Sequence, residues 1–379
     1  MRTWAIVHLG RFLENIQAVQ ERIGPEKRIC VPVKADAYGH GAPEIAKTSL
    51  KAGISCFSVA TVKEGTELRK SGIKEQILLF SQPHPEEIPE LISSCLTPVI
   101  SDEWYADTLN KQANGKLPVH MKIDTGMGRF GCPAEEALAL AQHISSCPKL
   151  EIKGTSTHFA VSDSSDEADT AYTNCQLSCF KETITAIKTA GIDPGIIHAA
   201  NSGAVIRYPD TWFDMVRPGI LLYGYKTAEE NNLKDIKPVK VQPVMELRTV
   251  VVLIKKIKKG ESVSYGRTWI AEQDTYIAIL PLGYADGLPR LVSNNWHVTI
   301  YGKPYPIVGR ISMDQCCIDL GPQPNVRRWQ EAVVIGSPSK NAADMAKLTG
   351  TIPYEITCNI NKRVPRIYEA YGVTINELS

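Results

Sequence analysis

The sequence predicts an α/β protein with an N-terminal (β/α)8 barrel of the TIM type and a C-terminal mainly-β domain. Eight short apolar runs lie within residues 28–224, and amphipathic stretches separate most of them. Strands that alternate with helices are typical of βαβ units, and eight such units are typical of a closed barrel. Beyond residue 243 the strands lose most of their intervening helices, which indicates a separate β-rich domain.

The barrel strands are predicted in order along the chain. Helical stretches such as "AEEALALAQHISS" lie between them and carry apolar residues three and four positions apart. An open doubly wound sheet is the main alternative, but no G-x-G-x-x-G motif follows the first strand, so its dinucleotide-binding form lacks support. The predicted strands cover 28–33, 56–60, 76–80, 96–100, 118–123, 151–159, 195–200 and 213–224.

A polar, charged connection, "KTAEENNLKDIKPVKVQP" (226–243), separates the two parts of the chain. We therefore assign 9–230 to the barrel, and 1–8 with 231–379 to the mainly-β domain. Strands of the second domain are predicted at 244–257, 275–283, 297–309, 315–321 and 331–336, with one late helix at 340–350.

The composition excludes several classes of protein. The net charge is +1, which argues against a non-specific binder of nucleic acid. Ten scattered cysteines form no C-x-x-C pair and no zinc-ligand spacing, so we expect no metal and free, mostly buried thiols in a reducing cytoplasm. The N-terminus lacks the features of a signal peptide, and no stretch is long enough to span a bilayer.

Polar residues gather where the predicted strands end, and the active face of a barrel lies at those carboxyl ends. A buried or half-buried lysine there has a lowered pKa, because desolvation disfavours the ammonium form, and its neutral amine attacks aldehydes. Lys34 is therefore a candidate for holding pyridoxal phosphate, and the loops "ANSGA" and "RPGI" suit its phosphate. Taken singly, each residue equally fits a surface or turn position. The set comprises Lys34, Lys122, Arg129, His158, Asn201, Ser202, Arg217 and Gly219.

The segment "VKADAYGHG" (33–41) resembles the cofactor-lysine signature of alanine racemases. Other segments match in the same order, among them "KIDTGMGRFG" (122–131), "HAANSGA" (198–204), "SYGRTW" (264–269) and "VGRISMDQ" (308–315). The resemblance covers nearly the whole chain. Two departures are His8, where the family commonly has an acidic residue, and Gly203, where alanine is common. The resemblance implies a barrel that binds pyridoxal 5'-phosphate and a C-terminal β-domain.

Racemisation requires that a proton leaves one face of Cα and returns to the other, which takes two bases. The resemblance assigns these roles to Lys34 and Tyr265. A tyrosine has a pKa of about 10, so Tyr265 needs assistance near neutral pH. The family places it beside a histidine matching His158, which meets the arginine matching Arg217. Arg217 also keeps the pyridine nitrogen unprotonated, which would suppress transamination.

The resemblance assigns the remaining site residues as well. Arg129 and the Met313 backbone would receive the substrate carboxylate, and Lys122 matches a lysine that is often carbamylated. Tyr284 and Tyr354 would narrow the entrance. Because the second base lies in the β-domain, the family forms a head-to-tail homodimer with shared active sites. The cofactor contacts are expected from Lys34, Tyr38, His158, Asn201, Ser202, Arg217, Gly219, Ile220 and Tyr354.

Other functions fit parts of the same pattern. A serine racemase or one of broad specificity differs from an alanine racemase by little more than a hydroxyl in a small pocket. A decarboxylase on the same fold is disfavoured by Arg217 and by "SYGRTW". A non-catalytic carrier of pyridoxal phosphate would be a single barrel without the β-domain. A role in D-alanine supply for the bacterial cell wall is implied by the family alone.

Overall fold

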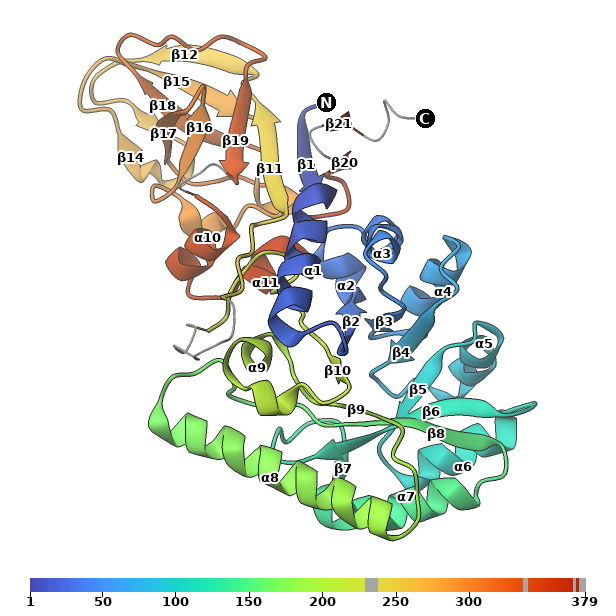
Figure 1. The fold of residues 1–379 in the computed structure, drawn as a ribbon. Coiled ribbons are helices and arrows are strands. Elements are labelled where there is room, and N and C mark those ends of the chain that lie inside the picture. Colours follow the sequence, from blue (N-terminus) through green and yellow to red (C-terminus); the bar gives the residue numbers. More distant parts are fainter. Residues whose placement is uncertain (229–237, 337–339, 371–372, 375–379) are drawn as a thin grey trace. The chain divides into compact units, whose positions relative to one another are not determined.

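The computed structural model of the protein describes residues 1–228, 238–336, 340–370 and 373–374, and the predicted domain boundary at 230/231 falls outside them. The chain divides into two compact units (Figure 1). The barrel unit comprises Leu13–Ala37 and Ala42–Val241, and the β-unit comprises Met1–Phe12, Tyr38–Gly41 and Gln242–Ser379. The chain therefore leaves the barrel unit briefly at Tyr38, within the segment that follows the first barrel strand.

The barrel unit is a closed ring of eight parallel strands, which confirms the predicted fold class. The order is β5-β4-β3-β2-β10-β9-β8-β6, and pairing of β5 with β6 closes the ring, while the short β7 pairs only with β6. Their bounds are β2 Arg28–Pro32, β3 Cys56–Val59, β4 Gln76–Leu79, β5 Thr97–Ile100, β6 Leu117–Asp124, β7 Cys132–Pro133, β8 Leu150–Ser156, β9 Ile196–His198 and β10 Met215–Val216.

Helices cover the outside of this ring, as Figure 1 shows. Several begin at a capping side chain: Thr61 and Glu64 form a capping box on α4, and Asp102 and Asp166 accept first-turn amides of α6 and α8. The helices are α1 Leu9–Ile23, α3 Ala42–Lys51, α4 Val62–Lys70, α5 Ile88–Ser93, α6 Glu103–Gln112, α7 Ala137–Ser146, α8 Glu167–Thr189 and α9 Ser202–Arg207.

The segment Lys34–Tyr38 (α2) turns in the left-handed sense. Ala35, Asp36, Ala37 and Tyr38 have φ values of 51°, 53°, 53° and 55°. Left-handed helical backbone costs L-residues roughly 1–2 kcal/mol each, so surrounding contacts must hold this turn. The unusual hand of this turn is a finding of the structure.

The β-unit is built on one ten-stranded sheet, in the order β12-β15-β18-β17-β16-β19-β11-β1-β20-β21, with a small β13-β14 ribbon. N-terminal strand β1 pairs antiparallel with β11 and parallel with β20, so residues 3–8 belong to this sheet. The strands are β1 Thr3–His8, β11 Met245–Val250, β12 Leu253–Ile257, β13 Ser262–Val263, β14 Trp269–Ile270, β15 Thr275–Leu280, β16 His297–Ile300, β17 Lys303–Val308, β18 Cys316–Gly321, β19 Glu331–Ile335, β20 Arg366–Ala370 and β21 Val373–Thr374.

Within the described part of Gln242–Ser379, two α-helices are present: α10 (Ala342–Thr349), which was predicted, and α11 (Pro353–Cys358), which was not. Among the residues of both units that the structure describes, no helix has the length and apolar character needed to cross a membrane. All ten cysteines are free thiols, but only half of them are buried: Cys30, Cys56, Cys132, Cys147 and Cys316.

Candidate active site

The carboxyl ends of the barrel strands carry the cationic residues that the sequence singled out. Lys34 follows β2 by two positions, Lys122 lies in β6, His158 follows β8, and Arg217 directly follows β10. The sequence placed Arg217 inside its strand, but that strand ends at Val216. The following residue is a proline, which has no N–H with which to continue the ladder.

Lys34 is exposed in the structure, so the expectation of a buried or half-buried lysine is wrong for the single chain. The physical reason is that β2 ends at Pro32 and the left-handed turn begins at Lys34, so the lysine is not part of the buried strand. Glu64 holds this turn, because its two carboxylate oxygens accept from the amides of Ala35 and Ala60, both at 2.7 Å. Asp36 accepts from the Ala42 amide at 2.8 Å on the far side of the turn.

Arg217 is buried and is oriented by hydrogen bonds to neutral groups. Its Nη1 donates to His198 Nδ1 at 2.6 Å, and its Nη2 donates to the carbonyl oxygens of Thr157 at 2.6 Å and Ala199 at 3.1 Å. The guanidinium also lies 5.4 Å from the ring centroid of Phe80, within cation–π range. Its Nε donates to no acceptor in the described chain, which leaves a donor for a ligand.

His158 lies among four cations of the barrel unit. Burial lowers its pKa well below the ordinary value, and the charges of Arg217, Lys122, Arg129 and Lys34 lower it further. The Arg217 Nη2 lies 3.4 Å from His158 Nδ1. His158 is therefore a neutral imidazole near neutral pH, and the surrounding positive charge fits a ligand that carries phosphate or carboxylate groups.

Lys122 is buried and donates from Nζ to the carbonyl oxygen of Phe130. Burial, with smaller effects of the Arg217 and Arg129 charges, lowers its pKa to about 8. An amine with this pKa is partly deprotonated in mildly alkaline solution, and the neutral form is the nucleophile. The reactivity that carbamylation requires is thus present at Lys122.

The loop that carries Arg129 is organised by Asp124. Its Oδ1 accepts from the amides of Gly126, Met127 and Gly128 at 2.9, 2.7 and 3.1 Å, and its Oδ2 accepts from the Arg129 amide at 2.9 Å. Desolvation opposes ionisation of this carboxyl, but the four backbone hydrogen bonds outweigh it and hold the Asp124 pKa below its ordinary value. The exposed Arg129 side chain starts from this ordered loop.

The two loops expected to hold a phosphate lie after β9 and β10. Asn201 caps α9, where its Oδ1 accepts from the Ala204 amide at 3.0 Å, and the buried Ser202 begins that helix. Ser202 Oγ accepts from the Leu221 amide at 3.3 Å, which ties the two loops together. Gly219 and Ile220 form the turn on the second loop, so backbone and hydroxyl groups meet at one place.

The remaining predicted site residues lie in the β-unit. Tyr38 and Tyr354, both expected at the phosphate, have ring centroids 5.7 Å apart. Tyr265 is 70% exposed and begins a 3₁₀ turn, Tyr265–Arg267. Lys34 belongs to the barrel unit, so the two predicted bases lie in different units of the chain.

Tyr284 and Met313 are brought together by backbone pairing between their loops. The Tyr284 amide donates to the Ser312 carbonyl at 3.1 Å, and the Ala285 amide donates to the Met313 carbonyl at 3.0 Å. A Cβ at Gly283 would lie 2.3 Å from both of these carbonyl oxygens, so this approach requires glycine. The pairing places these two exposed residues side by side on the β-unit.

Sequence reasoning missed several side chains that shape the site. His198 contacts Arg217, and His120 contacts His198. The Gln176 side chain donates to the His158 carbonyl at 3.2 Å and accepts from the Ala160 amide at 3.0 Å. A signal for two of them was present: His120 is two positions before Lys122 on the same strand, and His198 opens "HAANSGA". Gln176 lies on α8, where no local pattern distinguishes it.

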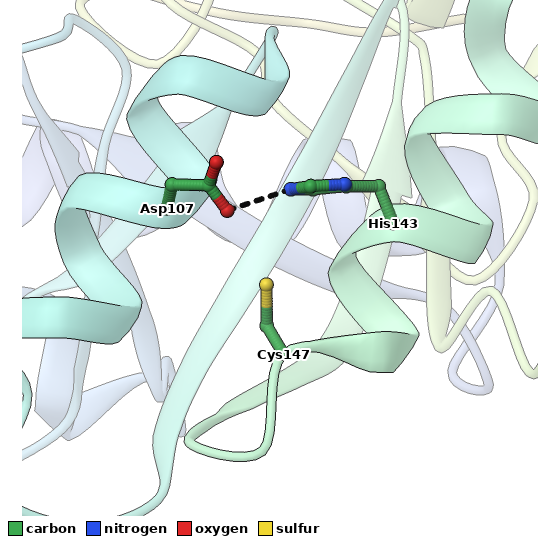
Figure 2. A group of neighbouring side chains, drawn as sticks. All are labelled: Asp107, His143 and Cys147. Atoms are coloured by element: carbon green, nitrogen blue, oxygen red, sulfur yellow. Dashed lines mark hydrogen bonds and ion pairs between the residues drawn. The ribbon is translucent and has the colours of Figure 1, made fainter.

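A group with metal-ligand chemistry lies outside this site. Figure 2 shows Asp107 on α6, His143 on α7 and Cys147 just beyond α7, with ligand atoms within 4.8 Å of one another. Asp107 Oδ1 accepts from His143 Nε2 at 2.8 Å, and Asp107 is exposed. Zinc-bound oxygen and nitrogen atoms each lie about 2.0–2.2 Å from the metal, so tetrahedral ligands stand farther apart than this pair. The contact has the geometry of a hydrogen bond between a histidine and a carboxylate, beside a thiol.

Comparisons with known proteins cover almost the entire chain. The models of the alanine racemase N-terminal and C-terminal domains match residues 7–227 and 244–368. An alanine racemase of Treponema denticola is 52% identical over 376 residues, covering 97% of this chain and 98% of that protein.

Solved structures agree with the sequence comparisons. The alanine racemase of Clostridium difficile 630 superposes with a TM-score of 0.91 at 32% identity, covering 99% of this chain and 97% of that one. That of Bartonella henselae, solved with covalently bound pyridoxal phosphate, superposes with a TM-score of 0.84 at 29% identity, covering 97% and 100%.

Proposed function

This chain belongs to the alanine racemase family of isomerases, and on that premise we propose that it interconverts L-alanine and D-alanine with pyridoxal 5'-phosphate as its cofactor. The observation that carries the proposal is the gathering of Lys34, Lys122, Arg129 and Arg217 around the neutral His158 at one barrel mouth. The barrel would bind the cofactor through residues 9–230, and the domain formed by 1–8 and 231–379 would supply the second base.

The residues present fit pyridoxal phosphate. Arg217 keeps its Nε free for an acceptor such as a pyridine nitrogen, and the joined loops at Ser202 and Gly219 offer N–H and O–H groups to a phosphate. Tyr38 and Tyr354 would contribute their hydroxyls there, and Asn201 and Ile220 would shape the loops. When bound, the cofactor draws electron density from Cα and so acidifies the Cα–H bond.

Lys34 would hold the cofactor through Nζ and serve as the base on one face of Cα. Its exposure at the mouth supports access to both cofactor and substrate. Arg217 retains its proton at any physiological pH, so it would donate a hydrogen bond to the ring nitrogen and keep that nitrogen unprotonated. His158, held neutral by burial and by the neighbouring cations, would accept or donate a single hydrogen bond without adding charge.

The substrate carboxylate would bind Arg129 and the Met313 backbone. Carbamylation of Lys122 would convert a buried cation into an anion that orients Arg129. The lowered pKa of Lys122 supports this modification, because it raises the fraction of reactive amine. Intact-protein mass spectrometry at alkaline pH with bicarbonate tests it. An unmodified mass, with Lys122→Ala indistinguishable from the parent in its affinity for a carboxylate inhibitor, would reject the carbamate.

Tyr265 would serve the opposite face of Cα from the partner subunit of a head-to-tail homodimer. Its 70% exposure in the single chain supports this, because a catalytic base must become enclosed to exclude water. Tyr284 and Tyr354 would line the entrance to the shared site. The ten free thiols support a cytoplasmic location, where cysteines stay reduced. The D-alanine produced there would be used in the synthesis of the bacterial cell wall.

The deciding experiment follows deuterium entry at Cα in deuterated buffer, with L-alanine, D-alanine and L-serine, and reads inversion by circular dichroism. Tyr265→Phe should lose inversion by at least about a hundredfold yet still exchange the Cα proton of one enantiomer, because Lys34 serves that face. Tyr301→Phe removes the hydroxyl of a tyrosine that is 87% exposed in the same unit and should behave as the parent.

Three outcomes would reject the proposal in different ways. Cofactor binding without any Cα exchange would indicate a carrier. Release of carbon dioxide would indicate a decarboxylase. Faster inversion of serine than of alanine would indicate a serine or broad-specificity racemase.

A further inference from the structure

A row of three side chains crosses the barrel interior behind Arg217. His198 Nδ1 accepts from Arg217 at 2.6 Å, and His198 Nε2 lies 2.9 Å from His120 Nδ1. His120 Nε2 in turn lies 3.4 Å from Nε2 of the Gln76 side-chain amide, at the start of β4. The row therefore links Arg217, just beyond β10, to side chains on β9, β6 and the first residue of β4.

The barrel is shaped to contain this row. His120 and His198 have no exposed surface, and their ring centroids lie 5.0 Å apart at 63°. A Cβ at Gly154, on the neighbouring strand β8, would lie 2.4 Å from His120 Cε1, so only glycine leaves room for this imidazole. Burying two polar imidazoles costs more free energy than burying leucines in the same space, unless the imidazoles are hydrogen-bonded.

Arg217 fixes the direction of every hydrogen bond in the row. A guanidinium can only donate, so His198 Nδ1 must accept and His198 carries its single proton on Nε2. That proton is donated to His120 Nδ1, which places the His120 proton on its own Nε2. The His120 Nε2–H then requires an acceptor, so the Gln76 amide, whose nitrogen is drawn against His120, must be turned by 180° to bring its oxygen to this position.

The reverse direction fails at the arginine. If the Gln76 amide group donated to His120 Nε2, both imidazoles would carry their protons on Nδ1. His198 Nδ1–H would then point at an Arg217 N–H, two donors 2.6 Å apart. Protonation of either ring would produce a similar clash in a site where burial and the Arg217 charge already disfavour cations.

We propose that His120 and Gln76 are positioning residues, which hold His198 as the Nε2–H tautomer and thereby fix the Arg217 guanidinium with its charge uncompensated. This inference deepens the proposed function, because its effect on catalysis depends on Arg217 meeting the pyridine nitrogen. A carboxylate in place of His198 would hold the arginine equally well but would cancel much of its charge. Neutral imidazoles hold it and leave the positive charge directed at the ligand.

The first test reads the tautomers directly and does not depend on activity. In the purified holoenzyme labelled with 15N-histidine, His120 and His198 should both be neutral Nε2–H tautomers that do not titrate between about pH 5.5 and pH 8.5, across the ordinary histidine range. Their signals should be absent in His120→Gln and in His198→Gln, respectively. His143→Gln, at the exposed Asp107 pair, is the matched control and should remove neither. An Nδ1–H tautomer or a charged imidazole at either position would overturn the proposal.

The second test separates positioning from general stability. Gln76 is half-buried, so Gln76→Leu and Gln76→Glu can be compared in folded protein. Transamination converts L-alanine and bound pyridoxal phosphate to pyruvate and pyridoxamine phosphate, without net gain of atoms or electrons. Gln76→Leu leaves the His120 N–H unpaired, so transamination relative to racemisation should rise by about tenfold, the effect of one unpaired buried donor. Gln76→Glu keeps an acceptor and should change this ratio by less than about threefold.

A parallel fall of both reactions in Gln76→Leu, with the ratio unchanged, would show a structural role only and would reject the positioning role. Should the holoenzyme racemise no substrate while the two tautomers are found as expected, the proposed function fails but the hydrogen-bond row stands. The two inferences are therefore distinguishable.

Discussion

Replacement of Asp124 by asparagine tests whether the ordered loop presents Arg129 to the substrate. The carboxylate accepts three amides at Oδ1 and the Arg129 amide at Oδ2. Asparagine can keep the three bonds to its carbonyl oxygen, but its NH2 group then faces the Arg129 N–H. The variant loses one hydrogen bond and gains one donor–donor contact, at the point where the loop reaches the arginine.

The expected cost follows from that count. One unsatisfied buried donor costs about 1–3 kcal/mol. Because Asp124 is half-buried, we expect a cost in the lower part of this range for Asp124→Asn, about 1–2 kcal/mol. If this cost appears as lost population of the binding-competent loop, the KM for alanine rises by about 5- to 30-fold, while kcat changes less than about threefold. The global fold should persist, because the core of the barrel is untouched.

Steady-state rates with L-alanine and D-alanine measure both constants. Asp193→Asn is the matched control: this exposed aspartate accepts from the Gly195 amide at 2.9 Å, before β9 on the other rim of the barrel. Its KM should stay within about twofold of the parent. A normal KM in Asp124→Asn, with kcat reduced instead, would refute the reasoning, because the loop would then not position a group that binds the ground state.

Three further predictions concern stability. Desolvation opposes ionisation of Glu246, but hydrogen bonds from His8 and other partners lower its pKa to about 2. The stability that ionised Glu246 contributes is therefore present above pH 4.5 and is lost as the pH falls toward 2. Glu246→Gln should lower the free energy of unfolding by about 1–3 kcal/mol at pH 7 and should flatten this acid transition in thermal melts. Gly154→Ala should lower the free energy of unfolding by about 1–3 kcal/mol, because the added methyl group overpacks against His120. Adding His120→Ala to this variant should recover part of the loss. If the melting-temperature shifts of the two substitutions simply add, the predicted coupling is contradicted. Burial lowers the Lys122 pKa from 10.5 to about 8, so an unmodified Lys122 makes the free energy of unfolding rise between pH 8 and pH 10.5. The pH profile of Lys122→Met should lack this rise. If the parent protein also lacks the rise, the carbamate is favoured.

The sequence was sufficient for the barrel because parallel strands that are buried on both faces read as continuous apolar runs. All eight runs became strands, and the polar residues at their carboxyl ends met at one mouth, as a closed parallel ring requires. The prediction was poorest at element ends. Strand β10 has only two residues, because Pro218 cannot donate to its neighbours, and so Arg217 lies outside the strand in which it was placed.

Two features of the site depend on residues far apart in the sequence and were therefore not predicted. The left-handed turn after Lys34 is held by Glu64, about thirty residues further along, and no propensity of Ala35 or Ala37 signals it. The burial of Lys34 was inferred from its apolar strand, whereas exposure is decided by the direction in which the chain leaves that strand. Roles that arise from a partner side chain, such as that of His120 behind Arg217, require the ring to be closed before they can be recognised.

The left-handed turn also limits how this protein can be divided or recombined. The chain passes from the barrel unit to the β-unit at Tyr38 and returns at Ala42. Within the β-unit, Gly39 approaches Thr357 so closely that a Cβ would lie 2.2 Å from its carbonyl oxygen, and Arg366 donates to the Gly39 carbonyl at 2.9 Å. A gene fragment that encodes the barrel alone would carry this four-residue excursion without its partners. The two domains are consecutive in most of the gene but are not separable modules, so a chimera of two relatives should exchange residues 38–41 together with the C-terminal domain.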